Sequence, residues 1–102
     1  MKAEIREWLV GQFGTDVDVI AEIYAEYVKS SHEKVVELDR ALADGDLARV
    51  DRIAHTLKGN ALMTGDRETA DAAIALRQAA LGGDAGACAA HAGTVRSLVA
   101  VL

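Results

Sequence analysis

The residues best placed to do chemistry are a histidine and its neighbours in the segment 54–66, which reads A-H-T-L-K-G-N-A-L-M-T-G-D. Residues three and four apart share one face of a helix, so His55 lies beside Lys58 and Gly59 if this segment is helical. An exposed imidazole can present a neutral, nucleophilic nitrogen near neutral pH. An ammonium one turn away would offset negative charge carried on that ring. The pattern therefore predicts a nucleophilic histidine on a water-facing helix surface.

Three more residues of this segment fit a docking surface better than a packed one. Glycine inside a helix costs roughly 1 kcal/mol relative to alanine, so Gly59 indicates that open space beside His55 is needed. Leu62 and Met63 place apolar side chains on exposed surface near the ring, which suits a partner protein. The opposite face of the same helix is expected to pack in the core and consists of Leu47, Val50, Ile53, Ala54, Leu57 and Ala61.

The segment resembles the acceptor motif of histidine-containing phosphotransfer (HPt) domains, which act in two-component phosphorelays. That motif has an acceptor His, then an apolar residue, Lys, Gly, small residues and a second Gly at fixed spacing. Asn60 and Thr64 depart from it, because a small residue and an apolar residue are usual at those positions. The likeness extends upstream through A-L-A-D-G-D-L, and the spacing of helical segments agrees over nearly the whole chain. The matching residues are His55, Leu57, Lys58, Gly59, Ala61 and Gly65.

The resemblance implies that His55 takes a phosphoryl group from the aspartyl phosphate of a receiver domain, or gives it back, through Nε2. The expected partners are response-regulator receiver domains, a hybrid sensor kinase, or both. Phosphoryl transfer depends mainly on positioning and charge stabilisation. The chain has neither an acidic pocket for a metal nor a glycine-rich phosphate loop, so the receiver is expected to supply Mg²⁺ and most of the catalytic machinery. We expect no cofactor, no metal site and no intrinsic kinase activity.

One position of the following helix departs from the family in a way that matters. HPt domains often place Glu or Gln there, within hydrogen-bonding reach of the acceptor imidazole, whereas this chain has Arg77 followed by Gln78. A hydrogen bond at one ring nitrogen decides which nitrogen is free to react. Three interpretations stay open: Arg77 contacts the phosphoryl oxygens, Gln78 orients the ring, or both are surface residues without a contact.

Two other functions compete with this one. The dimerisation and phosphoacceptor segment of a sensor histidine kinase also exposes a histidine on a helix, but an acidic residue usually follows that histidine and a proline lies a few positions on. Here Thr56 follows, and the chain has no proline and no glycine-rich ATP-binding box. The other alternative is a helical interaction module without phosphotransfer activity, in which Leu62 and Met63 bind a helix and His55 has no role.

Composition bounds the remaining possibilities. The chain has 102 residues, enough for one core, so we expect a single domain over residues 1–102. Its net charge of −5 disfavours nucleic acid and anionic membranes, which are bound mainly through Lys and Arg. We see no membrane span and no signal-peptide core, and the lone Cys88 fits a reducing compartment. We therefore expect a monomer in the cytoplasm.

Hydrophobic periodicity and turn residues predict an all-α fold, an up-and-down antiparallel four-helix bundle with a short N-terminal capping helix. The first helix ends at Gly14, and Thr15 or Asp16 starts a long helix that continues to Leu42. The D-G-D sequence ends that helix, and Asp46 caps the motif helix. Gly65 and Asp66 reset the chain for a helix whose expected inner face consists of Ala70, Ala73, Ile74, Leu76, Ala80 and Leu81. Asp84 caps the last helix, whose expected apolar stripe contains Cys88, His91, Val95, Leu98 and Leu102.

Two other histidines are given no chemical role. Cys88 and His91 have the spacing of two zinc ligands, but a structural zinc site needs four, and both residues fall on the apolar stripe of the last helix. We interpret them as a packed free thiol and a tucked-in histidine. His32 lies among polar residues of the long helix and is expected on the surface.

Overall fold

The computed structural model describes residues 1–102 and contains five α-helices and no strands, which confirms the predicted all-helical class. Each connection between helices is short, and the molecule measures 44 × 19 × 19 Å. None of the helices has the length and apolar character that a bilayer crossing requires. The helices are α1 (Ala3–Phe13), α2 (Val17–Ala43), α3 (Leu47–Thr64), α4 (Arg67–Leu81) and α5 (Ala85–Ala100).

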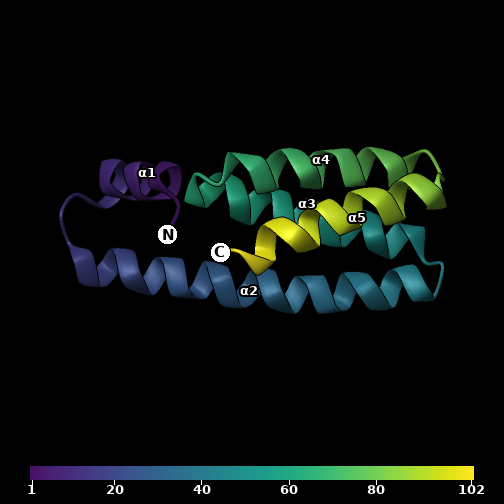
Figure 1. Cartoon of the computed structure of the whole chain (residues 1–102), viewed down its shortest axis with the longest axis horizontal. Helices are drawn as coiled ribbons and strands as arrows, with labels where there is room; N and C mark the ends of the chain where they lie inside the picture. The colour runs from purple at the N-terminus through teal and green to yellow at the C-terminus, as the bar shows by residue number, and fades with distance from the viewer.

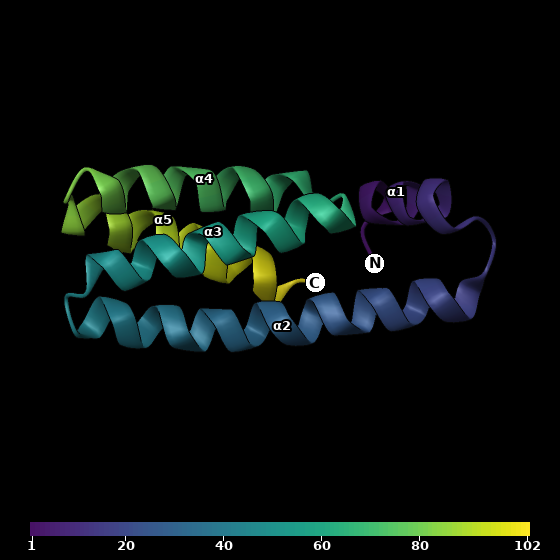
Figure 2. The same cartoon turned by 180° about the vertical axis from the view of Figure 1, so that it is seen from behind.

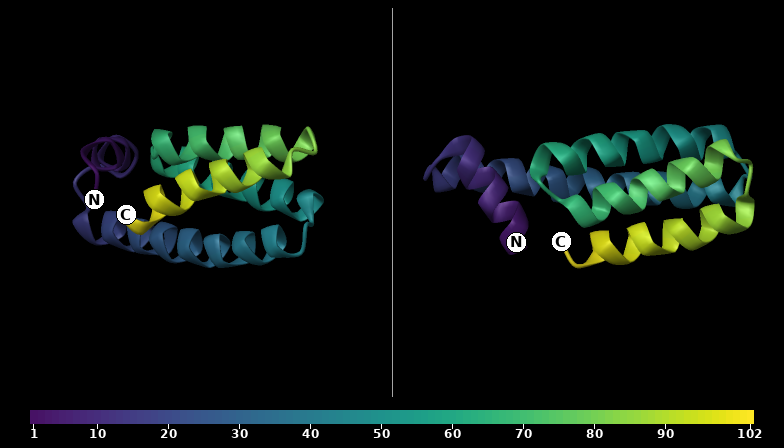
Figure 3. Two further views of the ribbon diagram at one scale, coloured as in Figure 1. Left: turned by 45° about the vertical axis from the view of Figure 1, so that its right-hand side comes forward. Right: turned by 90° about the horizontal axis from the view of Figure 1, so that it is seen from above.

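Helices α2 to α5 form a ring in which α2 and α4 each contact both α3 and α5. Consecutive helices of this ring run in opposite directions (Figure 1). The first part of α2 extends beyond the other three, and α1 lies over that extension (Figure 2). Seen from above, α1 crosses α2 at an angle, and the two chain termini lie near each other, at the start of α1 and the end of α5 (Figure 3).

Glycine and aspartate define the turns between the long helices. Gly45, Gly65 and Gly83 have positive φ angles of 66°, 76° and 70°, which side chains disfavour. The aspartate after each glycine caps the next helix by accepting a backbone N–H three residues on. These capping distances are 3.1 Å for Asp46, 3.4 Å for Asp66 and 2.9 Å for Asp84. Asp16 caps α2 in the same way, so the predicted starts of α2, α3 and α5 are confirmed.

The core has two parts, and small residues let the helices approach closely. The larger part joins α2, α3, α4 and α5, and the smaller part lies beneath α1, where Ile5 and Leu9 are fully buried. Leu102 packs against both parts. The buried side chains that α3, α4 and α5 contribute to the larger part are Val50, Ile53, Ala54, Leu57, Ala72, Ala73, Leu76, Ala80, Cys88, Ala92, Val95 and Val99.

The predicted inner face of α4 is partly wrong. Leu81 is 68% exposed, because it is the last residue of α4 and lies about 140° around the helix from the buried Leu76. Ile74 is only half-buried, whereas Thr69 and Ala72 face inward. On α5, His91 and Leu98 are half-buried, and Ala92 and Val99 complete the buried stripe.

A buried carboxylate ties α1 to the rest of the molecule. Asp66 is fully buried, and besides capping α4 it accepts hydrogen bonds from the Tyr27 hydroxyl at 2.6 Å and from Lys2 Nζ at 3.0 Å. Burial alone would raise the pKa of Asp66, but the hydrogen bonds from Thr69, Tyr27 and Lys2 outweigh it and hold the pKa below its usual value. Burial and the neighbouring Asp66 raise the pKa of Tyr27, so its hydroxyl stays protonated and donates.

Replacing Asp66 tests this network. The change Asp66→Asn keeps the shape but removes the charge that faces Lys2 and Tyr27, and we expect a loss of about 1–3 kcal/mol in the free energy of unfolding at neutral pH. A folded-state pKa below the unfolded value stabilises the protein above the unfolded value, and this contribution disappears as the pH falls through the folded value. The difference between the two proteins in urea unfolding should therefore shrink below about pH 4.

The control for this measurement is Asp84→Asn, since Asp84 is an exposed N-cap that holds only the Ala87 N–H. We expect it to cost less than about 1 kcal/mol at neutral pH. Equal losses for the two variants, or a difference that persists unchanged at low pH, would contradict the role given to the buried carboxylate.

Candidate functional site

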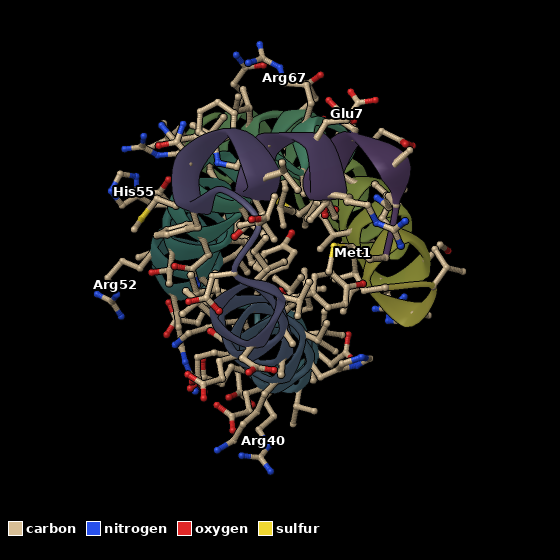
Figure 4. All side chains as sticks on the ribbon, turned by 90° about the vertical axis from the view of Figure 1, so that its left-hand side faces the viewer. Met1, Glu7, Arg40, Arg52, His55 and Arg67 are labelled. Atoms are coloured by element: carbon tan, nitrogen blue, oxygen red, sulfur yellow. The ribbon has the colours of Figure 1, made fainter.

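His55 lies in the middle of α3 with its ring outside the bundle. The residue is exposed, as its helical phase predicts, and its ring takes part in none of the side-chain hydrogen bonds, although Thr56 next to it donates to the Arg52 carbonyl at 3.2 Å. Figure 4 shows His55 and Arg52 projecting from α3 on the same side, away from the ribbons. Both ring nitrogens are thus open to a partner, while the helix that carries the ring is anchored by the buried Ala54 and Leu57.

On the next turn of α3, a cationic side chain and a position without a side chain lie near His55. Lys58 is half-buried and forms no ion pair, so its ammonium is free to meet an anion beside the ring. Gly59 has helical backbone geometry, and apart from the backbone of its own helix and its two chain neighbours, a Cβ there would meet no atom within 4 Å. The absence of a side chain at position 59 is therefore not required by the packing of this molecule.

Apolar surface continues from the histidine toward the end of α3. Leu62 is 40% exposed and Met63 is 76% exposed, in agreement with the predicted apolar surface. Leu62 lines a groove of about 460 Å³ between α1 and α3, together with Glu4, Glu7, Trp8, Gly65 and Arg67. Met63 lines a second groove of about 400 Å³ between α2 and α3, together with Phe13, Ile23, Glu26, Tyr27, Ser30, Asn60 and Thr64.

Trp8 lines the first of these grooves, and the sequence pattern did not predict its contacts with α3. Its Nε1 donates to the Met63 carbonyl at 3.1 Å, and its side chain lies directly on Gly65. A Cβ at position 65 would overlap Trp8 Cβ and Cγ, so this glycine is needed for the contact as well as for its positive φ. Gly65, the motif glycine at the end of α3, therefore also allows α1 to pack beside Leu62.

Arg77 and Gln78, the two residues of α4 considered as neighbours of the His55 imidazole, differ in their contacts. Arg77 Nε donates to Asp51 Oδ1 at 2.9 Å, and Asp51 lies one turn before His55 on α3. Gln78 is exposed and makes no side-chain hydrogen bond, so the structure provides no contact through which it would orient the ring. Nothing in the sequence indicated that Arg77 would reach Asp51 from another helix, because the two residues are 26 apart in the chain.

The remaining candidates lie away from His55. His32 is exposed on α2, whereas Cys88 is fully buried on α5 with the half-buried His91 one turn on. Burial raises the pKa of the Cys88 thiol, which keeps it protonated. No group of three or more His, Cys, Asp or Glu side chains lies close enough together to hold a metal ion.

Comparison with known proteins gives one match. The family model described as the Hpt domain matches residues 22–102, which includes most of α2 and all of α3, α4 and α5. No curated protein and no solved structure matches the chain. The match contains His55 and its neighbours but leaves out α1 and therefore Trp8.

The two motif glycines should respond oppositely to alanine. Since Gly59 is an interior helical residue with open space around it, Gly59→Ala should increase the free energy of unfolding by roughly 0.5–1 kcal/mol and raise the melting midpoint by several degrees. Gly65→Ala should lower the midpoint, because the new Cβ meets Trp8 and the backbone φ of 76° disfavours it. Thermal melts followed by circular dichroism measure both. A Gly59→Ala variant that melts earlier than the parent would show that position 59 does have a packing role.

Proposed function

The chain belongs to the Hpt domain family of two-component phosphorelays, and we propose that His55 is the residue that carries the phosphoryl group. In this proposal a ring nitrogen of His55, Nε2 by resemblance to the family, attacks the phosphorus of a receiver's aspartyl phosphate. The bond from phosphorus to the aspartyl oxygen breaks, and the carboxylate leaves with the electron pair. The reverse step returns the phosphoryl group to a receiver.

The observation that carries this proposal is the exposed imidazole of His55 on a helix whose opposite face is buried. His55 combines free ring nitrogens with the unpaired cation of Lys58 and the open space at Gly59. Neither His32 nor His91 has a lysine and a glycine at the following turn. Proximity and orientation can supply much of the barrier reduction in such a transfer, so a rigidly held but accessible ring suits the task.

The partner domain has a defined place in this proposal. A receiver docks over Leu62 and Met63, its acyl phosphate enters the space at Gly59, and Lys58 offsets the charge of the transferred group. The receiver supplies Mg²⁺, and the chain itself has no kinase activity. The scaffold is an up-and-down antiparallel four-helix bundle of α2 to α5 capped by α1. We further propose that the protein acts as a monomer in the cytoplasm, where receivers and hybrid kinases present their phosphorylated domains.

Transfer from a phosphorylated receiver tests the identity of the acceptor. His55→Gln should abolish acid-labile labelling of the protein, because it removes the nucleophile while leaving an exposed surface position otherwise polar. The matched controls are His32→Gln and His91→Gln, which should label at the parent rate. The assay is a short-time transfer series against receivers and hybrid kinases of the source genome. Labelling that survives in His55→Gln would overturn the assignment, and labelling by no receiver at all would favour the interaction-module alternative.

A second substitution tests the docking surface. Leu62→Gln should weaken receiver docking and slow transfer at low receiver concentration, since it removes apolar area from the groove beside α1. Because Leu62 is already 40% exposed, the free energy of unfolding should change by no more than about 1 kcal/mol.

Leu81→Gln is the matched control, because Leu81 is 68% exposed at the opposite end of α4 from the α3–α4 turn. It should leave the concentration dependence of transfer unchanged. Equal effects of the two variants would remove Leu62 from the docking surface.

A further inference from the structure

The ion pair of Arg77 with Asp51 brings a guanidinium from α4 to a residue that lies one turn before His55 on α3. Arg77 Nε lies 2.9 Å from Asp51 Oδ1, and the two side chains are 37% and 23% exposed. Both side chains of the pair are therefore partly buried and partly accessible to solvent. Unlike the exposed pair of Arg67 and Asp71, which both lie on α4, it bridges α3 and α4.

Helix geometry brings this pair toward the acceptor histidine. Asp51 and His55 are four residues apart on α3, so their Cβ atoms lie about 5–6 Å apart on one face. Helices α3 and α4 are antiparallel neighbours joined by the turn at Gly65 and Asp66. Arg77 on α4 and His55 on α3 are about equally far from that turn along the chain, so they lie at a similar position along the two antiparallel helices. From there the Arg77 side chain extends to Asp51.

The guanidinium has donors to spare. The hydrogen bond to Asp51 uses Nε, and the terminal nitrogens Nη1 and Nη2 donate no hydrogen bond in the structure. Arg96 shows the contrasting arrangement, because it pairs with Asp39 through Nη2. A planar guanidinium can hold a carboxylate on one edge and present its other donors to phosphate oxygens, which Lys cannot do with the same geometry.

We propose that Arg77 binds the phosphoryl group on His55 through its terminal nitrogens while Asp51 holds its Nε, so that Arg77 is a phosphoryl-binding residue and Asp51 is a positioning residue. This rests on the proposed function in one respect, that His55 can carry a phosphoryl group. The pair also removes a conflict of charge. Without the guanidinium, the Asp51 carboxylate would lie one turn from a phosphoryl dianion and repel it.

The test loads His55 without any receiver. Potassium phosphoramidate is the donor: the imidazole nitrogen attacks phosphorus, the phosphorus–nitrogen bond of the donor breaks, and ammonia leaves with the proton released from the ring. The ³¹P resonance of the phosphorylated protein is then followed against pH. In Arg77→Ala the titration midpoint of the phosphoryl group should rise by roughly 0.3–1 pH unit, because a cation that favours the dianion is lost.

Three variants separate this role from a structural one. Arg77→Lys should restore part of the shift, since it returns a positive charge without the fork. Adding Asp51→Asn to Arg77→Ala should move the midpoint back toward the parent value, because the repelling carboxylate is gone. Arg96→Ala breaks another interhelix Arg–Asp pair and should leave the midpoint unchanged.

The outcomes distinguish this inference from the relay function. A midpoint equal to that of the parent in Arg77→Ala overturns the inference, and if that variant does not fold, Arg77→Gln decides in the same way. Failure of phosphoramidate to label His55 also overturns it, because there is then no phosphoryl group to bind. The expected shift together with no transfer from any receiver would support the phosphoryl contact and overturn the relay function alone.

Discussion

The carboxylate of Asp66 is the interaction on which the arrangement of the other parts depends. It caps α4 through Thr69, and it accepts the Tyr27 hydroxyl from α2 and the Lys2 ammonium from the residue before α1. A fully buried carboxylate is costly unless its charge is compensated and its oxygens accept hydrogen bonds, so these three donors are required together. Removing one of these donors leaves the charge of the Asp66 carboxylate incompletely compensated. The α3–α4 turn, the middle of α2 and the chain start are thereby fixed relative to one another.

That constraint extends to the surface of α3 near His55, at the groove that contains Leu62. Helix α1 has only a small buried face, Ile5 and Leu9, so its position is set as much by Lys2 and by Trp8 as by apolar burial. Trp8 in turn lies on Gly65, and the groove that contains Leu62 is bounded by Trp8. Although α1 lies outside the region matched by the family model, it contributes one wall of the surface next to the motif helix.

Local sequence patterns predicted most of the fold, but they could not predict the contacts between helices. Each glycine–aspartate turn could be placed from sequence because positive φ and N-capping are local properties. The exposure of His55 also followed from the phase of α3 alone. The contacts of Asp66 with Tyr27 and Lys2, and of Arg77 with Asp51, could not be predicted. These partners are at least 26 residues away in sequence and are brought close only by helix packing. The error at Leu81 arose because an apolar residue at a helix end was assigned to a face that the helix does not turn inward.

The distribution of charge around His55 adds a further constraint on any chemistry there. The chain as a whole is acidic, with a net charge of −5, and a phosphoryl group on such a surface would be disfavoured by the overall field. Arg52 and Lys58 on α3 and Arg77 on α4 place positive charge at or near the same face of the molecule. Screening limits the influence of exposed charges to about 8–10 Å in physiological salt, so the charges beside His55 matter most, and there Arg77 pairs with Asp51 while Arg52 and Lys58 form no ion pair.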